Sequence, residues 1–239
     1  MEPPAAICFD MGYTLLRHSY DARPALTELL VAEGHAVDPQ ALAGALLEAR
    51  AHYLAAVRSG RDFETSMPAA VEFWTEYTSR ILDRVGVPAA AHAELSRRSF
   101  TRAWSPDAWE PFPEVPATLR ELRRRGTRMA VISNFVDTLH ALCARHDLTQ
   151  FFETVVCSTE VGLMKPDPRI FALAARRLEV AAEAVWYVGD SYWADVLGAR
   201  AAGMTPVWLD RDGAVERPDC VAIRRLDELL PLLDREAAA

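Results

Sequence analysis

Short apolar runs alternate with helical segments in the second half of the chain, and this alternation constrains the fold more than any other feature. The runs cover residues 129–132, 152–157, 184–188 and 205–209, and a segment with helical spacing follows each of the first three. Short apolar strands that alternate with helices are typical of a parallel sheet covered on both faces. A similar run at 5–9 predicts one more buried strand near the amino terminus. The sequence therefore predicts an α/β fold.

Residues 16 to about 107 contain helical patterns alone. Apolar side chains recur there at helical spacing, at Leu42, Leu46, Ala49, Tyr53 and Ala56 and again at Val71, Trp74, Thr78, Ile81 and Val85. Such stripes need a packing partner, so we expect a helical bundle. Because this stretch interrupts the alternation after its first strand, we interpret it as an inserted cap. The predicted domains are a core of residues 1–16 and 108–239 and a helical cap of residues 17–107.

The charge balance and the cysteines restrict the partners and the compartment. A formal net charge of -8 disfavours nucleic acid and anionic membrane surfaces, although a small phosphorylated ligand can still bind in a locally positive pocket. We expect no membrane span and no signal peptide, because no apolar run approaches about 20 residues and a strand-like segment starts near the amino terminus. The four cysteines are isolated, without zinc spacing. We expect a cytoplasmic monomer or homodimer.

Polar residues follow three of the predicted strands, where each strand ends. Asp10 follows the run at 5–9, Ser133 and Asn134 follow the run at 129–132, and Asp190 follows the run at 184–188. Ligands bind at the carboxyl ends of strands in an open parallel sheet, so folding should gather these residues at one edge. The backbone N–H groups after Ser133 can form a phosphate cradle if a helix begins there.

Three aspartates and one lysine are expected at that edge. Ser191 can cap a helix that begins near residue 192, which would turn Asp195 toward Asp190 and Asp10. Carboxylates this close repel one another unless a cation is present, and hard oxygen ligands suit Mg²⁺. Lys165 is the only lysine among 26 basic residues. Its compact ammonium suits a tight position between a carboxylate and a phosphoryl oxygen better than a planar guanidinium does.

Four motifs together resemble the haloacid dehalogenase (HAD) superfamily, in its C1-capped, phosphatase-like branch. They are Phe9-Asp10-Met11-Gly12-Tyr13-Thr14-Leu15, Ile132-Ser133-Asn134, Lys165-Pro166-Asp167-Pro168 and Gly189-Asp190-Ser191-Tyr192-Trp193-Ala194-Asp195. The resemblance covers nearly the whole chain. It implies a Rossmann-like parallel-sheet core with an inserted all-helical C1 cap, and hydrolysis of a small phosphorylated metabolite.

The resemblance also implies a role for each motif residue. Asp10 would be the nucleophile and form an aspartyl-phosphate, and Lys165 would neutralise charge on the nucleophile and on the phosphoryl group. Mg²⁺ would be held by Asp10, the backbone carbonyl of Gly12 and Asp190, with Asp195 in support. The implied phosphate-binding set is Thr14, Ser133, Asn134 and Lys165.

The first motif departs from the family pattern at Gly12. The family's phosphatases have a second aspartate there, which protonates the leaving group and then deprotonates the attacking water. General acid–base catalysis contributes about 10²–10⁴-fold, so its loss would be large. A phosphatase without this group would favour leaving groups of low pKa, and His18 or Tyr13 are candidates to replace it.

Candidate specificity residues in the cap and its hinges are Arg17, His18, Tyr20, Arg23, Arg102 and Trp104.

Gly12 also raises three other possible functions. Dehalogenases of the superfamily also lack the second aspartate, but they need no metal and lack the Gly-Asp pair, so Asp190 argues for phosphoryl chemistry. A phosphonatase-like enzyme would need a Schiff-base lysine in the cap, and residues 17–107 contain none. The third reading is a catalytically impaired protein that keeps the HAD fold and binds a phosphorylated ligand or a protein partner.

Overall fold

A six-stranded parallel sheet forms the centre of the protein in the computed structural model, which describes residues 3–213 and 218–236. The strand order is β5-β4-β1-β6-β7-β8. The bounds are β1 Ala6–Phe9, β4 Arg128–Ser133, β5 Thr154–Cys157, β6 Val185–Gly189, β7 Thr205–Leu209 and β8 Val221–Ile223. The predicted α/β fold is confirmed. The edge strand β8 was not predicted, because its three residues form no buried apolar run.

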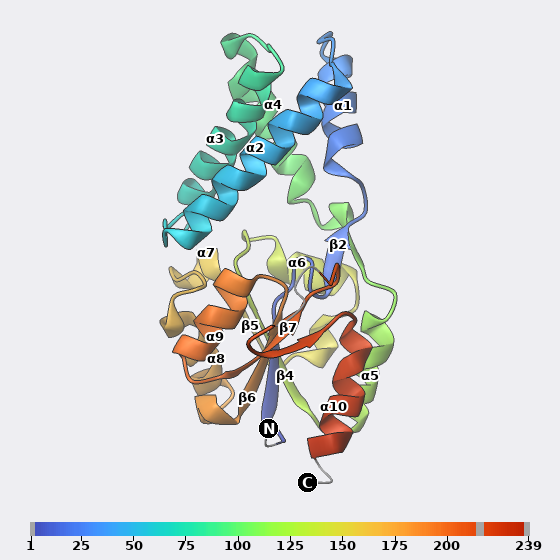
Figure 1. Ribbon diagram of the computed structural model, residues 1–239, viewed down its shortest axis with the longest axis vertical. Coiled ribbons are helices and arrows are strands. Elements are labelled where there is room, and N and C mark those ends of the chain that lie inside the picture. The colour runs from blue at the N-terminus through green and yellow to red at the C-terminus, as the bar shows by residue number, and fades with distance from the viewer. Residues whose placement is uncertain (1–2, 214–217, 237–239) are drawn as a thin grey trace.

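Helices cover both faces of this sheet (Figure 1). The strand pleat sends Ile7 and Phe9 to one face and Ala6 and Cys8 to the other. The first face packs against α5 (Val115–Arg124), α6 (Leu139–Arg145) and α10 (Leu229–Glu236). The second face packs against α8 (Pro168–Arg177) and α9 (Leu197–Ala201), while the short α7 (Ser158–Val161) follows β5. Burial on both sides explains why these strands appear as continuous apolar runs.

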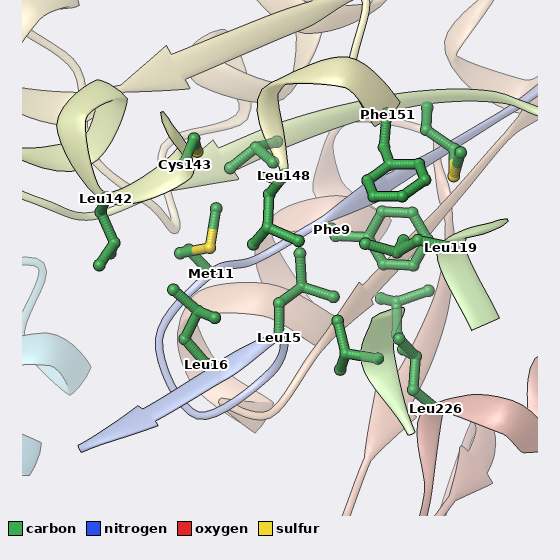
Figure 2. Close-up of a cluster of buried hydrophobic side chains, with 14 of the residues drawn as sticks. Phe9, Met11, Leu15, Leu16, Leu119, Leu142, Cys143, Leu148, Phe151 and Leu226 are labelled. Atoms are coloured by element: carbon green, nitrogen blue, oxygen red, sulfur yellow. The ribbon is translucent and has the colours of Figure 1, made fainter. Parts of the chain in front are cut away.

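The turn that follows β1 is anchored in the core. Met11, Leu15 and Leu16 are fully buried and join Phe9 and Leu119 in one cluster (Figure 2). Within the turn, the backbone N–H groups of Leu15 and Leu16 both donate to the Met11 carbonyl at 2.9 Å. The backbone around Asp10 and Gly12 is therefore held by apolar packing on one side and by a closed turn on the other.

Four helices form the insert between β2 (Leu16–His18) and β3 (Trp109–Pro111), and they lie beyond the carboxyl edge of the sheet (Figure 1). They are α1 (Ala22–Ala32), α2 (Pro39–Arg58), α3 (Met67–Arg84) and α4 (Ala89–Ala103). Leu30, Leu42, Leu82 and Leu95 form part of their shared core. Side chains cap α1, α2 and α3 at Asp21, Asp38 and Ser66. Among the described residues no helix is long and apolar enough to span a bilayer.

A short antiparallel ribbon joins the helical insert to the sheet. It consists of β2 (Leu16–His18) and β3 (Trp109–Pro111), with Leu16 opposite Pro111. The prediction that the stretch from residue 16 contains only helices was therefore wrong at its start. Three-residue strands are too short to show alternation, and these partners lie far apart in sequence, so only the folded chain reveals their pairing.

Other helix boundaries also differ from the predictions. The predicted helix at 192–202 is a π-turn at Tyr192–Val196 followed by α9. The segment predicted to be helical from about Val136 is irregular until α6 begins at Leu139. Near the carboxyl terminus, a 3₁₀ turn at Leu226–Glu228 precedes α10, and further 3₁₀ turns lie at Pro106–Ala108, Thr149–Phe151 and Ala182–Ala184.

Candidate active site

The three central strands place three of the predicted residues side by side. β1 lies between β4 and β6, and Phe9 is in register with Val131 and Val188. Asp10 follows β1, Ser133 ends β4, and Asp190 follows β6, so all three lie at the carboxyl edge. The Asp10 backbone N–H donates to the Val188 carbonyl at 2.9 Å, which extends the sheet pairing to the aspartate itself.

Lys165 lies in the middle of the site and is 2 % exposed. Its ammonium donates at 2.7 Å to Asp10 Oδ1, at 2.7 Å to Asp195 Oδ1 and at 2.9 Å to the Tyr187 hydroxyl. Burial alone would lower the pKa of Lys165, but the charges of Asp10 and Asp195 raise it above its ordinary value. Lys165 is therefore a buried cation at neutral pH.

The two carboxylate oxygens of Asp10 have different surroundings. Oδ1 accepts hydrogen bonds from Ser133 Oγ at 2.8 Å and from Lys165 Nζ. Oδ2 lies 3.5 Å from Thr14 Oγ1, which is itself 3.3 Å from Asp190 Oδ1. Oδ1 thus faces a hydroxyl and an ammonium, while Oδ2 is connected to Asp190 through the Thr14 hydroxyl.

Asp10, Asp190 and Asp195 each offer a carboxylate oxygen, and these oxygens lie within 4.8 Å of one another. Burial, followed by the charges of Asp10 and Asp195, raises the pKa of Asp190 well above its ordinary range. If all three carboxyl groups were ionised, the single positive charge of Lys165 would leave the site with excess negative charge. Closely spaced oxygen ligands with excess negative charge fit a hard divalent cation such as Mg²⁺.

Both oxygens of Asp195 accept hydrogen bonds of 3.0 Å or shorter, whereas Asp10 Oδ2 has only a 3.5 Å contact with the Thr14 hydroxyl. Oδ1 accepts from Lys165 and from the Tyr187 hydroxyl at 3.0 Å, and Oδ2 accepts from the Ser191 backbone N–H at 2.8 Å. Asp10 and Asp190 therefore remain the better candidate metal ligands, and Asp195 is better placed to hold Lys165. Sequence reasoning missed Tyr187, because a tyrosine within the apolar run of β6 looks like ordinary core.

Asn134 was predicted to bind phosphate, but both polar atoms of its side-chain amide are hydrogen-bonded to the Lys165 backbone. Its Nδ2 donates to the Lys165 carbonyl at 2.9 Å, and its Oδ1 accepts from the Lys165 backbone N–H at 2.7 Å. These paired bonds tie the loop before α8 to the end of β4. The geometry therefore favours a positioning role for Asn134, which fixes the backbone from which the Lys165 side chain extends.

The position without a side chain at Gly12 faces an aromatic ring. A Cβ there would lie 3.5 Å and 3.6 Å from two atoms of the Trp109 ring, which is ordinary van der Waals contact. The neighbouring Tyr13 has φ 57 and is 51 % exposed.

His18 packs against the same tryptophan, with 3.9 Å between the centres of the His18 and Trp109 rings. Burial lowers the pKa of His18. The His18 ring nitrogen Nδ1 lies 3.3 Å from the Ala108 carbonyl at the hinge.

The connection between α2 and α3 packs directly on the loops of the site. Phe63 is buried and its backbone N–H lies 3.4 Å from the sulfur of Met164, the residue before Lys165. Phe63 also shares a buried cluster with Ala194 of the fourth motif. In addition, the guanidinium of Arg58 lies 5.1 Å from the centre of the Trp193 ring. The helical insert thus contacts the third and fourth motifs through this end.

Glu64, next to Phe63, is a buried acid that sequence reasoning missed. It is 2 % exposed, and its Oε1 accepts a 3.1 Å hydrogen bond from Trp74 Nε1. Burial raises the pKa of Glu64 from 4.5 to about 8; the Trp74 hydrogen bond and Lys165 oppose this shift, while Asp10 adds to it. The sequence showed only an acidic residue between two segments with helical apolar spacing. Such a residue is more often exposed on a loop, so Glu64 was not predicted as a site residue.

Among the predicted specificity residues, Trp104 packs near the site, with its ring 4.7 Å from that of Phe135, which follows Asn134. Arg17, Tyr20 and Arg102 make other contacts. Tyr20 and Arg102 line a cavity of about 610 Å³ that none of the predicted catalytic or metal-binding residues line. The Arg102 guanidinium lies over the Tyr20 ring and donates to Glu28, while Arg17 pairs with Glu110. These residues stabilise the end of the helical insert that joins the ribbon of β2 and β3.

A family model described as haloacid dehalogenase-like hydrolase matches residues 4–203. Haloacid dehalogenase-like hydrolase domain-containing protein 3 from Homo sapiens is 31% identical over 236 residues, which cover 95% of this chain and 93% of that protein. Phosphoserine phosphatase from Thermus thermophilus is 39% identical over 127 residues, which cover 53% and 51% of the two chains. (S)-2-haloacid dehalogenase from a Pseudomonas species is 34% identical over 128 residues, which cover 52% and 55%.

A solved structure has the same fold over the whole chain. The HAD-hydrolase YfnB from Bacillus subtilis superposes with a TM-score of 0.75 at 21% identity, covering 98% of this chain and 100% of that one. At this identity the likeness is evidence for the fold alone. It supports the arrangement of a parallel sheet with an inserted helical bundle.

Proposed function

The chain belongs to the haloacid dehalogenase-like hydrolase family, and from this we propose that it is a Mg²⁺-dependent phosphatase of a small phosphorylated metabolite. The observation that carries the proposal is the convergence of Ser133 and Lys165 on one oxygen of Asp10, with the Thr14 hydroxyl between its other oxygen and Asp190. Two phosphatases, for phosphoserine and for glyceraldehyde 3-phosphate, are among the relatives and support this substrate class.

Asp10 Oδ1 is the proposed nucleophile. A phosphoryl group attached to this oxygen would bring its own oxygens within reach of the Ser133 hydroxyl and the Lys165 ammonium, which now contact Oδ1. Donors already aimed at the place where charge develops stabilise the transition state without a cost of reorganisation. Asp195 and Tyr187 keep Lys165 in position, and Lys165 compensates the charge of the transferred group.

Asp10 Oδ2, the carboxylate of Asp190 and the backbone carbonyl of Gly12 are the proposed magnesium ligands. The excess negative charge of the three aspartates supports a cation at this point. When bound, Mg²⁺ would supply charge neutralisation for the phosphoryl oxygens and reduce the repulsion between Asp10 and an anionic substrate. Thr14, whose hydroxyl lies between Asp10 and Asp190, would help orient both carboxylates.

Residues 17–107 are the proposed cap. The packing of Phe63 against Met164, and the position of Arg58 over Trp193, support closure of the insert over the site. Closure would exclude water from the aspartyl-phosphate until the leaving group has departed.

The test is phosphate release from 4-nitrophenyl phosphate by the purified protein, with and without Mg²⁺. The expected result is turnover that requires Mg²⁺ and is lost in Asp10→Asn, while Asp137→Asn, which changes an acid outside the described cluster, behaves like the natural chain. Absence of phosphate release from aryl, acyl and alkyl phosphates alike would contradict the proposal. Ligand binding without turnover would then favour the impaired, ligand-binding alternative.

A 2-haloacid dehalogenase is the second candidate. It is favoured by Gly12, which leaves the first motif without a second carboxylate, and by the dehalogenase among the relatives. The clustering of Asp190 with Asp10 weighs against it, because a dehalogenase of this family needs no cation. Halide release from 2-chloropropionate in the presence of EDTA would establish this candidate instead.

A further inference from the structure

We propose that Glu64, carried by the connection between α2 and α3, is the proton donor and acceptor that the first motif lacks at Gly12. This inference rests on the phosphatase activity proposed above. It assigns to the helical insert a catalytic group that acts on the leaving oxygen and on the attacking water. The missing function would thus be supplied from the cap and would be in place only when the insert is seated on the core.

The position of Glu64 supports this role. Its neighbour Phe63 packs on Met164, which precedes Lys165, so the connection reaches the loop that carries the buried cation. Lys165 and Asp10 are the two charged residues that act on the Glu64 carboxyl. On α2, Tyr53 is influenced in the same way: burial and the negative charges of Glu64, Asp190 and Asp10 raise its pKa. Glu64 therefore belongs to the same electrostatic cluster as the nucleophile.

The hydrogen bonding of Glu64 leaves one oxygen available for proton transfer. Trp74 can only donate, so Oε1, which accepts from it, keeps carbonyl character in the neutral acid. The proton is then carried by Oε2, for which the described residues provide no hydrogen-bond partner. A buried carboxyl held by one fixed donor, with its second oxygen unpaired, resembles the raised-pKa acids that protonate leaving groups in other enzymes.

The proposed chemistry balances over two steps. In the first, Asp10 Oδ1 attacks phosphorus, the bond between phosphorus and the leaving oxygen breaks, and Glu64 Oε2 gives its proton to that oxygen. In the second, the Glu64 carboxylate takes a proton from water, the water oxygen attacks phosphorus, and the bond to Asp10 breaks. Asp10 is returned as a carboxylate, Glu64 as a neutral acid, and the products are an alcohol and inorganic phosphate.

The experiment compares the natural chain with Glu64→Gln on two substrates in the presence of Mg²⁺. Glutamine keeps the size of the side chain and an acceptor for Trp74, but it transfers no proton. The substrates are glycerol 3-phosphate, whose leaving group needs a proton, and 4-nitrophenyl phosphate, whose leaving group does not. Glu72→Gln, an exposed glutamate on α3, is the matched control.

For Glu64→Gln we expect kcat on glycerol 3-phosphate to fall by about 10²–10⁴-fold. On 4-nitrophenyl phosphate the first step should survive and the second should slow, so one equivalent of nitrophenol is released in a burst and the phosphorylated protein accumulates. Gly12→Asp in the Glu64→Gln background should restore turnover of both esters, because it returns a carboxyl group to the first motif and its Cβ meets the Trp109 ring only in ordinary van der Waals contact. Glu72→Gln should match the natural chain.

The outcomes separate this inference from the function on which it rests. If the natural chain hydrolyses both esters and Glu64→Gln does so at similar rates without a burst, Glu64 has no such role and the phosphatase proposal stands. If the natural chain hydrolyses neither ester, both proposals fall. Should Glu64→Gln fail to fold, the natural chain still decides: a steep dependence of kcat/KM on leaving-group pKa would show that no proton donor acts.

Discussion

The carboxyl group of Asp195 lies directly over the Cα atom of Gly189. A Cβ on residue 189 would be 2.3 Å from Asp195 Cγ and 2.4 Å from its Oδ2. Asp195 lies in the single-turn π-helix Tyr192–Val196, which follows the end of β6. The same position places Asp195 within 2.7 Å of Lys165. The missing side chain at residue 189 is therefore a condition for the position of the buried cation.

Gly189→Ala should displace Asp195 and disturb Lys165. We expect a loss of about 1–3 kcal/mol in the free energy of unfolding, the usual cost of overpacking, together with a large fall in kcat. Gly44→Ala is the matched control, since a Cβ there meets nothing within 4 Å and the residue lies within α2. The control should be as stable as the natural chain or more stable. Urea denaturation and phosphatase assays on both variants check this, and equal kcat in all three proteins would contradict it.

Lys165→Arg should be strongly deleterious although it preserves charge. The ammonium contacts Asp10, Asp195 and Tyr187 at 2.7–2.9 Å in a buried space, and a planar guanidinium cannot occupy that point. We expect kcat to fall by about 10²-fold or more, as for other preorganised donors. Arg176→Lys, the reverse exchange on the exposed side of α8, should leave kcat unchanged. Full activity in Lys165→Arg would show that the site does not discriminate between the two cations.

Asp190→Asn should stabilise the metal-free protein and abolish its response to magnesium. The substitution removes the cost of burying this carboxyl group beside two other aspartates, the cost that raises the pKa of Asp190. For the natural chain, Mg²⁺ at 100 times its Kd should add about 2.7 kcal/mol of stability. We expect the variant to have a higher Tm without Mg²⁺ and no shift with it. A magnesium-induced rise in Tm that persists in Asp190→Asn would exclude this residue as a ligand.

Glu64 should make stability depend on pH in a defined window. Its pKa rises from 4.5 to about 8 on folding, so between these values the native protein holds a proton that the unfolded chain has released. Its contribution is therefore present at low pH and is lost as pH rises toward 8. Other groups near Glu64, including Lys165, Asp10 and Tyr53, are common to the natural chain and Glu64→Gln.

The measurement is urea denaturation of the natural chain and Glu64→Gln without metal, from about pH 5 to about pH 9. We expect the variant's advantage in free energy of unfolding to grow with pH and then level off above the Glu64 pKa. A difference that stays constant across the range would mean that Glu64 does not titrate on folding as described.

Arg211→Ala should weaken both the fold and the first motif. The guanidinium donates at 2.7 Å to the Thr14 carbonyl, at 3.2 Å to the Tyr13 carbonyl and at 2.7 Å to Glu114, which is buried. Removing one partner of a fully buried ion pair costs about 3–5 kcal/mol, because the other charge is left unpaired, and we expect a smaller loss here because the Arg211 side chain is partly exposed.

The double variant Arg211→Ala/Glu114→Gln is the control for that effect. It removes the unpaired charge, so it should recover part of the lost free energy of unfolding. It should not recover kcat, because the Tyr13 and Thr14 carbonyls would still lack their donor. If the double variant were fully active, the contact between Arg211 and the first motif would have no role in positioning Asp10.

Much of the core was predictable because its signals are local. Residues buried on both faces of a parallel sheet form continuous apolar runs, as in β1, β4, β6 and β7. Polar residues directly after such runs must lie at the carboxyl edge, which explains why Asp10, Ser133 and Asp190 could be placed together. Lys165 could be singled out because its residue type was so rare in this chain.

Other features depend on contacts between residues far apart in the sequence. The π-turn around Asp195, the clamp of Asn134 on the Lys165 backbone and the ribbon of β2 with β3 have no local pattern of their own. The same holds for Glu64. In the sequence it is an ordinary acid in a loop, and only the Trp74 hydrogen bond and the packing of Phe63 in the folded protein show that it is buried.

The sequence by itself determined the α/β core, the helical insert and the edge where the acidic and basic residues meet, because strand and helix periodicity follows from burial within each segment. Only the tertiary structure decided which oxygen of Asp10 faces Lys165, which aspartate holds that lysine, and which acid of the insert is buried beside the site. Those outcomes depend on distances and dielectric surroundings that arise only when separate segments pack together.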